Sequence, residues 1–541
     1  MTGADALVKC LVKEGVNTLF GYPGVAICPF FNSATQTDIE AILVRNEQNA
    51  AHAASGYARA TGKVGVCVAT SGPGATNLIT GIATAYADSI PIICITGQVE
   101  SSLLGSDVFQ EADITGACES FVKFSYLVKN VKDIPRIVKE AFHIASTGRK
   151  GPVLIDVPFD IQNASISNFE YPEEVNIRSY KPTTKGNAVQ IKKVISELCK
   201  AKKPVICVGG GVLLSNAKEE INTVAHKFNI PVVSTLMGIG VMRTDDSVYF
   251  GMVGNNGKSY ANKAMNEADL LVVVGARVAD RAISQPDLIT ENKVLIHIDI
   301  DPAEIGKNVG PSIPLVGDIK SIFSDLLEMI KDQEKLDFSK WIDELNIYKM
   351  AAPQRKEPRK DFVDPAKFID MLSDKMDEDA IYVADVGQNQ MWSCGYHKVK
   401  SGQFLTSGGM GTMGYSIPAA MGAKKGCPNR QVIAVCGDGS FQMSMNELAT
   451  LRQHDIPFKI VVFHNGYLGL VREYQHKTYD GNYSVVDLSG SPDLSLISQA
   501  YGIDFIRLEN GNDMKEKIDD FLNAKGPILM ECMLDPMDVV K

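Results

Sequence analysis

The 541-residue sequence lacks the features of several broad classes of protein. No apolar run is long enough to span a membrane, and Met1–Val16 does not have the form of a signal peptide, so we expect no membrane segment. Positive charge is not in excess, and the net charge of −10 argues against general nucleic-acid binding. The eleven cysteines are scattered, and no pair has the spacing of zinc ligands. They therefore predict reduced thiols in a cytoplasmic protein.

The hydrophobic share of 45% and the charged share of 22% are ordinary for globular proteins, and the chain is too long for one core. Short β-branched apolar runs alternate with helical segments in three blocks. This alternation predicts an α/β fold with three doubly wound parallel-sheet domains, at 1–162, 189–328 and 365–534. The polar residues 163–188 are expected to form a linker, and the charged residues 331–361 a surface connection with helical parts.

The most informative segment is 431–467. It predicts a strand at Gln431–Cys436, a helix at Ser440–His454 and a second strand at Lys459–His464. Such a unit forms a right-handed crossover between parallel strands. Asp438 and Asn465 would then lie at the carboxyl ends of nearby strands, where open α/β sheets bind ligands.

The chemistry of this segment points to a metal and a diphosphate. Asp438 and Asn465 offer the hard oxygen ligands that Mg²⁺ prefers. Gly437 and Gly439 allow a sharp turn, and the helix that begins near Ser440 points its amides at the same place. An ordinary glycine-rich turn with a capping aspartate is the alternative, because Asp-Gly is a common dipeptide. The 25 residues from 440 to 464 that separate GDG from Asn465 match the spacing of thiamine-diphosphate enzymes.

The two ends of the chain share a pattern. SGPG (71–74), a helix, Ile90-Pro91 and a strand parallel CGDG (436–439), a helix, Ile456-Pro457 and a strand. Pro73 stands in the first copy where Asp438 stands in the second, so only the second copy should hold Mg²⁺. Chance similarity between two αβ units is the alternative.

Several longer segments extend the likeness. They are FGYPG (20–24), VRNEQNAAHAASGYARATGK (44–63), TSGPGATNLITGIATAYADSIP (70–91), TGQV (96–99), DVFQE (107–111), VGAR (274–277), HIDIDPAEI (297–305), DVGQNQMW (385–392) and SGGMGTMGY (407–415). With them the chain resembles the acetolactate (acetohydroxyacid) synthase family of thiamine-diphosphate enzymes. The resemblance implies a pyrimidine-binding domain, a flavin-type central domain and a diphosphate-binding domain. It also implies a homodimer or homotetramer with shared active sites, and a possible regulatory subunit.

The resemblance assigns three catalytic residues. Glu47 would sit beside the pyrimidine ring and share a proton with it, as a carboxylate in a desolvated pocket can. Its alternative is a glutamate in the first turn of a helix, stabilised by the dipole alone. Arg277 would receive the carboxylate of the second keto acid through its guanidinium fork, with a surface ion pair as the alternative. Gln110 would lie near the substrate channel, in the FQE segment.

The implied cofactors are thiamine diphosphate, Mg²⁺ and, less directly, FAD. Asp438, Asn465 and the carbonyl of Tyr467 would hold the metal. The residues implied for thiamine diphosphate are Gly24, Gly387, Gln388, Asn389, Gly411, Met413, Gly439 and Ser440. Met413 would prop the cofactor into its bent form, although a core methionine is the alternative. The residues implied for FAD are Gly209, Gly210, Gly211, Asp299, Glu304 and Asp318, but a bare triple glycine without GxGxxG does not establish a dinucleotide site.

The implied reaction is decarboxylation of pyruvate and transfer of its two-carbon unit to a second 2-keto acid, giving 2-acetolactate. Several positions depart from the family pattern: Asn255-Asn256 replace Met-His, Phe159 replaces lysine, Tyr474 replaces tryptophan, and His464 replaces an asparagine. The first three favour, as an alternative, transfer from the same donor to an aldehyde or keto-sugar. A flavin-dependent pyruvate oxidase is the other alternative.

Overall fold

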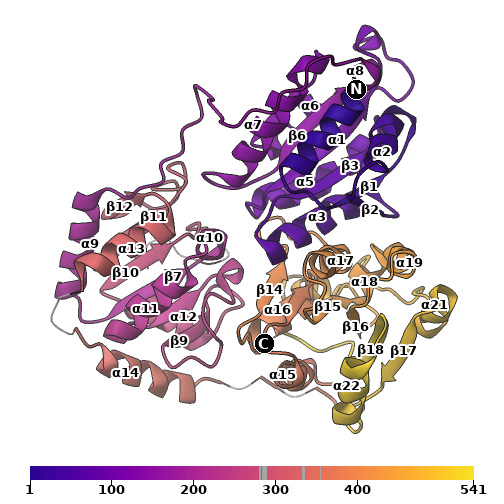
Figure 1. Ribbon diagram of the computed structural model, residues 1–541. Coiled ribbons are helices and arrows are strands. Elements are labelled where there is room, and N and C mark those ends of the chain that lie inside the picture. The colour runs from indigo at the N-terminus through magenta and orange to yellow at the C-terminus, as the bar shows by residue number, and fades with distance from the viewer. Residues whose placement is uncertain (280–281, 283–288, 332–335, 354, 357, 541) are drawn as a thin grey trace.

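The chain folds into three α/β domains, each built on a six-stranded parallel sheet flanked by helices (Figure 1). The structure is a computed structural model that describes residues 1–279, 282, 289–331, 336–353, 355–356 and 358–540. The predicted fold class is confirmed, since each sheet is parallel throughout and its central strands are buried on both faces. Within the described part of the chain, no helix is both long and apolar enough to cross a membrane.

The N-terminal sheet has the strand order β2-β1-β3-β4-β6-β5. Its strands are β1 (Thr18–Tyr22), β2 (Glu40–Leu43), β3 (Gly65–Ala69), β4 (Ile92–Gln98), β5 (Phe124–Leu127) and β6 (Val153–Pro158). Its helices are α1 (Gly3–Lys13), α2 (Cys28–Ala34), α3 (Glu47–Thr61), α4 (Pro73–Asn77), α5 (Ile79–Ala87), α6 (Ile114–Cys118), α7 (Ile134–Ser146) and α8 (Phe159–Asn163). Short 3₁₀ turns lie at η1 (Val25–Ile27), η2 (Ser101–Leu103), η3 (Glu119–Phe121) and η4 (Val131–Asp133).

The central sheet has the order β12-β11-β10-β7-β8-β9. Its strands are β7 (Pro204–Val208), β8 (Val232–Ser234), β9 (Tyr249–Met252), β10 (Leu270–Val274), β11 (Val294–Asp299) and β12 (Ile313–Val316). Its helices are α9 (Ala188–Lys200), α10 (Gly210–Leu214), α11 (Lys218–Phe228), η5 (Leu236–Gly238), α12 (Ser259–Glu267), α13 (Ile319–Met329) and α14 (Ser339–Met350). Helix α14 falls in the stretch expected to form a surface connection, yet its Trp341 and Leu345 are buried in the central core.

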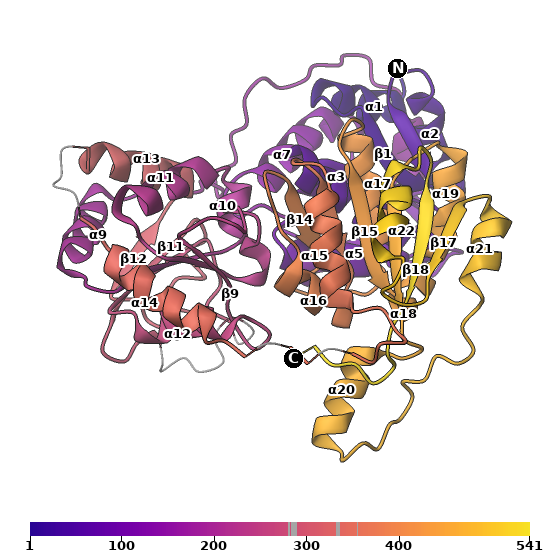
Figure 2. The ribbon, with the colours of Figure 1, turned by 90° about the horizontal axis from the view of Figure 1, so that it is seen from below.

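The C-terminal sheet has the order β14-β13-β15-β16-β18-β17. Its strands are β13 (Ile381–Ala384), β14 (Gln403–Thr406), β15 (Val432–Gly437), β16 (Lys459–His464), β17 (Asp504–Leu508) and β18 (Ile528–Met533). Its helices are α15 (Pro365–Lys375), α16 (Gln388–Tyr396), α17 (Ser416–Gly426), α18 (Asp438–Gln442), η7 (Met445–Glu447), α19 (Leu448–Gln453), α20 (Gly469–Thr478), α21 (Leu494–Tyr501) and α22 (Met514–Asn523). Seen from below, α20 projects away from the sheet (Figure 2).

One local expectation was wrong. The predicted helix Ser440–His454 is broken into α18, η7 and α19, because Ser444 leaves the helical conformation at φ −137° and ψ 10°. The break lets Glu447 bury its carboxylate against the backbone amide of Arg45 and the side chain of Asn49. The triple glycine at 209–211 forms the start of α10, where Gly209 and Gly211 pack directly on the backbone at Gly275.

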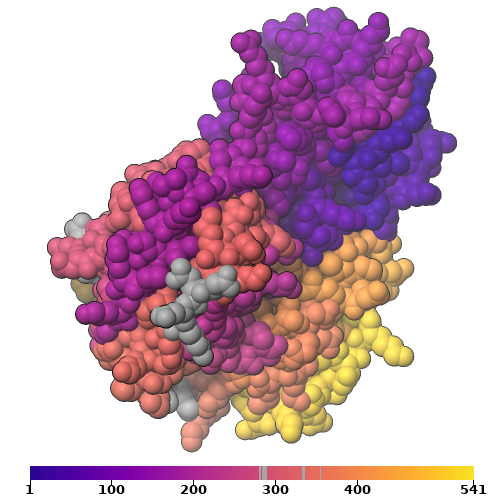
Figure 3. Space-filling view, turned by 60° about the vertical axis from the view of Figure 1, so that its left-hand side comes forward, coloured from indigo at the N-terminus to yellow at the C-terminus, as the bar shows by residue number. Residues whose placement is uncertain are grey.

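The N-terminal and C-terminal domains share one hydrophobic core. Helices α3 and α17 meet in backbone contact, since a Cβ on Gly56 would strike the carbonyl of Ala419 and one on Gly422 the carbonyl of Ala53. We call this contact the α3–α17 seam. In the space-filling view the central domain lies against both other domains, so the three form one body (Figure 3).

Candidate active site

A cavity of about 120 Å³ lies at the carboxyl ends of the adjacent strands β13, β15 and β16. The residues predicted for the metal and for thiamine diphosphate that line it are Gly387, Gln388, Asn389, Met413, Asp438, Gly439, Ser440, Asn465 and Tyr467. Gly387 has φ 144°, a conformation that favours glycine, at the N-terminus of α16. We call this cavity the diphosphate pocket.

Asp438 is the buried acid of this pocket, only 3% exposed. Its carboxylate accepts hydrogen bonds from the amides of Gly439 (2.9 Å) and Gly466 (2.7 Å), and its Oδ2 is 3.8 Å from His464 Nε2. Burial raises the pKa of the Asp438 carboxyl, and the charge of His464 and the amides of Gly466 and Gly439 only partly offset this effect. A cation at this position would stabilise the ionised form.

Asn465 is held in place by two side-chain hydrogen bonds. Its Oδ1 accepts from the amide of Tyr467 at 3.0 Å, and its Nδ2 donates to Gln388 Oε1 at 3.1 Å. The described residues contain no cluster of three or more His, Cys, Asp or Glu that could hold a metal. A cation in the diphosphate pocket would thus rely on one carboxylate, one amide oxygen, a backbone carbonyl and the oxygens of its ligand, a donor set that suits Mg²⁺.

His464 connects the metal-site acid to a second buried acid. Its Nδ1 lies 2.6 Å from Oε1 of Glu531, and Arg507 Nε donates to Oε2 of the same carboxylate at 2.6 Å. The hydrogen bond to Glu531, with the charge of Asp438, raises the pKa of His464. His464 therefore places a basic group beside the predicted metal ligand Asp438.

Glu47 lies in a separate group of residues at the edge of the N-terminal sheet. It begins α3 after the N-cap Asn46, and it is 9% exposed. Its Oε2 accepts from Asn77 Nδ2 at 2.9 Å, and a Cβ on Gly74 would lie 3.3 Å from its Oε1. Glu47 is therefore both buried and placed at the N-terminus of a helix.

Gly24 and Gln110 lie around the same 70–74 loop. A Cβ on Gly24 would lie 2.5 Å from the Cβ of Thr70, and one on Gly72 would lie 2.9 Å from the carbonyl oxygen of Gln110. Gln110 has φ 60°, and its neighbour Phe109 is 87% exposed. None of Gly24, Glu47 and Gln110 lines the diphosphate pocket, whose walls come only from residues 386–471.

Loop 407–413, which carries the predicted residues Gly411 and Met413, is held by α5 of the N-terminal domain. Thr84 Oγ1 and Thr412 Oγ1 are 2.7 Å apart. Asp88, one turn further along, accepts from the amides of Gly409 (2.6 Å) and Gly408 (3.3 Å). Gly411 lines neither the diphosphate pocket nor the larger cavity described next.

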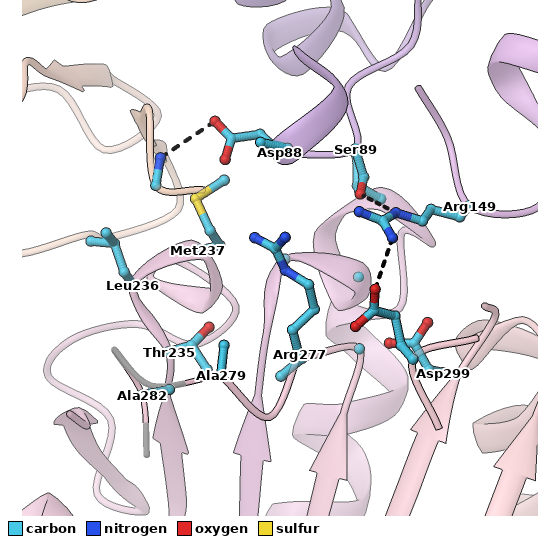
Figure 4. A pocket seen from close by; sticks show the side chains of 18 of the residues that line it. Asp88, Ser89, Arg149, Thr235, Leu236, Met237, Arg277, Ala279, Ala282 and Asp299 are labelled. Carbon is cyan, nitrogen blue, oxygen red and sulfur yellow. Dashed lines mark hydrogen bonds and ion pairs between the residues drawn. The ribbon is translucent and has the colours of Figure 1, made fainter. Parts of the chain in front are cut away.

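The larger cavity, of about 430 Å³, lies where the central domain meets the other two (Figure 4). The predicted residues that line this central cavity are Gly210, Gly211, Arg277, Asp299, Glu304 and Asp318, whereas Gly209 does not. Arg277 extends into it between Met237 and Arg149 (Figure 4). Burial raises the pKa of the Asp299 carboxyl to about 6.

Arg149 is a wall residue that the sequence did not single out. Its Nη1 is 3.2 Å from Asp301 and 3.0 Å from Glu304, and its Nε donates to Ser89 at 3.0 Å. It joins the N-terminal domain to the central one. The Arg149-Lys150 pair in the loop before the buried strand β6 was the available signal, since two neighbouring cations suit an anionic ligand.

The substituted positions separate in space. Asn255 and Asn256 line the central cavity. Phe159 begins α8, and Tyr474, 59% exposed, lies on the projecting α20; neither lines either cavity. Of the substituted positions, only Asn255 and Asn256 therefore line the cavity that Arg277 of the same chain enters.

Asp156, a buried carboxylate on strand β6 of the N-terminal domain, gives a prediction about how stability depends on pH. It is 2% exposed and accepts from Thr96 Oγ1 (2.6 Å) and Gln98 Nε2 (3.0 Å). Burial raises its pKa to about 7, from about 3.9 in the unfolded chain. Its contribution to stability is therefore full below about pH 4 and is lost as the pH rises to about 7.

Asp156→Asn should gain stability over the wild type as the pH rises through that window, by about 2–4 kcal/mol above pH 7. Unfolding followed by circular dichroism at pH 5 and pH 8 measures the difference. Asp38→Asn, at an exposed position of the same domain, is the control. A stability difference that does not change with pH would contradict the assignment.

Comparison with known proteins places the whole chain among related sequences. Residues 1–117, 191–326 and 385–532 match the N-terminal TPP-binding, central and C-terminal TPP-binding domains of the thiamine pyrophosphate enzymes. A probable acetolactate synthase large subunit of Methanocaldococcus jannaschii is 43% identical over 100% of this chain and 93% of its own. The acetolactate synthase large subunit of Cyanidium caldarium is 43% identical over 98% and 93%, and that of Corynebacterium glutamicum 43% over 95% and 83%.

Proposed function

From the premise that this chain belongs to the acetolactate synthase family of thiamine pyrophosphate enzymes, we propose that it forms 2-acetolactate from two molecules of pyruvate. The observation that carries the proposal is the diphosphate pocket. Nine residues expected from scattered sequence segments meet there, around one buried acid.

Thiamine diphosphate, when bound, supplies the electron sink for decarboxylation. Asp438 and Asn465, with the carbonyl of Tyr467, would hold Mg²⁺ in the diphosphate pocket. Ser440 and the glycines at 387 and 439 would contact the diphosphate. Because α18 begins at Asp438, the first amides of that helix add donors for phosphate oxygens.

Glu47 holds and releases a proton at its carboxylate. Among the described residues only Asn77 donates a hydrogen bond to Glu47, at Oε2, which leaves Oε1 for the exchange. Arg277 binds and orients the carboxylate of the acceptor keto acid through its planar fork. Asp88 lies close to Arg277 and fixes the loop that packs beneath it.

The central cavity has the donors for a flavin dinucleotide, and we include FAD as a bound cofactor. Arg149 suits phosphate oxygens, and Asp299 and Asp318 suit ribose hydroxyls. The visible absorption spectrum of the purified protein measures flavin content independently of activity. Anaerobic bleaching of that spectrum by pyruvate would instead favour a flavin-dependent pyruvate oxidase.

Product analysis tests the proposal. Protein supplied with pyruvate, thiamine diphosphate, Mg²⁺ and FAD is expected to release CO₂ and form acetolactate. Absence of acetolactate at saturating pyruvate would overturn it.

Because Asn255 and Asn256 place amide groups in the cavity that Arg277 enters, the second candidate is transfer to an aldehyde or keto-sugar. An acceptor that outcompetes pyruvate in the same assay would favour that candidate.

We propose a homodimer as the smallest active unit, because Glu47 and the diphosphate pocket are apart in one chain. Exposed apolar side chains accompany both groups: Val25 (77%) and Phe109 (87%) near the first, Met443 (59%) and Val485 (95%) near the second. Homotetramers would repeat this contact, and the relatives named large subunits suggest a regulatory partner. The buried cysteines Cys67, Cys94, Cys207 and Cys436 are not in disulfides, which suits the cytoplasm.

Mixing two inactive variants tests the shared site. Glu47→Gln and Asp438→Asn chains, unfolded together and refolded in equal amounts, should recover roughly one quarter of wild-type activity, because half the dimers are mixed and each carries one intact site. Each variant refolded alone is the control. No recovery in the mixture, with dimers shown by light scattering, would place Glu47 and Asp438 of one chain in the same site.

A further inference from the structure

A third cavity, of about 160 Å³, lies where the three domains meet. Its walls include the end of α3, the residues between α10 and α11, and β14. Figures 1 and 2 both show α10 on the side of the central domain that faces the other two. We call this third cavity the junction pocket. It is smaller than the roughly 300–1,000 Å³ of pockets for drug-sized ligands, so it suits a small molecule or ion.

Three cationic side chains and one carboxylate line the junction pocket. Arg59 comes from α3, Lys150 from the loop before β6 and Lys218 from the first turn of α11. The carboxylate belongs to Asp88, which already accepts from two backbone amides and faces both Arg59 and Arg277. The pocket therefore carries an excess of positive charge.

Two of the three cations are fixed by hydrogen bonds to neutral groups. Lys150 Nζ donates to the carbonyl of Leu214 at 2.8 Å. Arg59 Nη1 donates to the carbonyl of Thr406 at 2.6 Å and to the Tyr415 hydroxyl at 3.3 Å. Such bonds orient the donors without neutralising their charge, so a site for an anion is prepared in advance.

Lys218 differs from the other two. Over the described ranges of the chain, its Nζ makes no hydrogen bond or ion pair. Burial lowers the pKa of Lys218, and the charge of Arg430 lowers it further. Burial lowers the pKa of Lys150 as well, although the charge of Asp318 raises it in part. A half-buried cation without an ion pair costs free energy, and an anion bound beside Lys218 would reduce that cost.

We propose that the junction pocket binds a small multiply charged oxyanion, either inorganic phosphate or the phosphate group of a small metabolite. The guanidinium fork of Arg59 suits two oxygens of one phosphate, and the lysines supply point charges. The junction pocket shares Asp88, Lys150, Gly210, Leu214 and Met237 with the central cavity. It is nevertheless a distinct site, because Arg59, Lys218 and the β14 residues line only the junction pocket.

Calorimetry with inorganic phosphate tests the proposal. The protein is first saturated with thiamine diphosphate, Mg²⁺ and FAD, so that no other phosphate site is open, and sodium chloride keeps the ionic strength constant. The wild type is expected to bind phosphate saturably, at one site per chain. Lys218→Gln is expected to weaken binding by about 10–100-fold, as loss of a hydrogen bond to a charged group does.

Matched variants separate this site from general charge effects. Lys193→Gln, at an exposed position of α9, should bind phosphate like the wild type. Lys218→Arg should restore binding in part. Unfolding temperatures without phosphate check that Lys218→Gln folds, as expected for a side chain with no bond to lose.

The source of the anion is decided by a second titration with glycerol 3-phosphate. Tighter binding than inorganic phosphate would identify a phosphorylated metabolite as the ligand, and weaker binding would identify the free ion. The proposal is overturned if the wild type shows no saturable binding. It is equally overturned if Lys218→Gln and the wild type bind phosphate with the same affinity.

Discussion

Glu47→Gln is expected to lower turnover of pyruvate by about 10²–10⁴-fold, the usual contribution of a general acid-base group. Glutamine keeps the shape of the side chain and its hydrogen bond with Asn77, but it cannot hold or release a proton. Binding of thiamine diphosphate should change little, because the diphosphate and the metal are held by the other domain. Steady-state kinetics and a cofactor titration by tryptophan fluorescence measure the two effects separately.

Glu119→Gln is the matched control, since Glu119 is exposed in the same domain. Its turnover should equal that of the wild type. Glu47→Gln protein that turns over pyruvate at the wild-type rate would remove Glu47 from the proposed chemistry. Loss of cofactor binding in that variant would assign Glu47 a structural role instead.

Asp438→Asn is expected to weaken the Mg²⁺-dependent binding of thiamine diphosphate by about 100-fold or more, and to abolish turnover with it. Losing a supporting group of a metal ligand typically costs about 10–100-fold in affinity, so losing the charged ligand itself should cost at least that. The apo-protein should remain folded, because a neutral amide replaces a buried charge of the same shape. Thermal unfolding with and without Mg²⁺ and cofactor measures both.

The wild type should show a clear rise in unfolding temperature when metal and cofactor are added together. Asp438→Asn should lose that rise, whereas Asp455→Asn, exposed at the end of α19, should keep it. An equal rise in Asp438→Asn and the wild type would mean that the cation binds elsewhere.

The interior strands could be predicted from the sequence because burial on both faces leaves a continuous apolar run. Strand β16 has the predicted bounds, and β15 lies one residue later than predicted, at Val432–Gly437. The edge strands β5 and β17 are partly exposed on both faces, so they carry no such run and were not predicted. The break within 440–454 depends on Glu447 meeting Arg45, a contact across 402 positions of sequence that no local pattern records.

Site residues were predictable where a motif follows a strand directly, as Asp438 follows β15 and Asn465 follows β16. Their partners were not. Gln388 meets Asn465 and Asp88 meets Gly409 only through the packing of distant elements. Arg149 was not predicted for the same reason, because its ion pair with Glu304 joins two different domains.

The α3–α17 seam has a consequence for anyone who would recombine these enzymes. Helix α3 begins at Glu47, and Gly56 of α3 together with Gly422 of α17 fixes its distance from the C-terminal domain. A chimaera that takes its first domain from one homologue and its third from another would inherit two helices selected against different neighbours. A single methyl group at Gly56 or Gly422 would push α3 away from α17 and shift Glu47 at the N-terminus of α3. Successful exchanges should therefore cut elsewhere and transfer residues 47–61 and 416–426 as a pair.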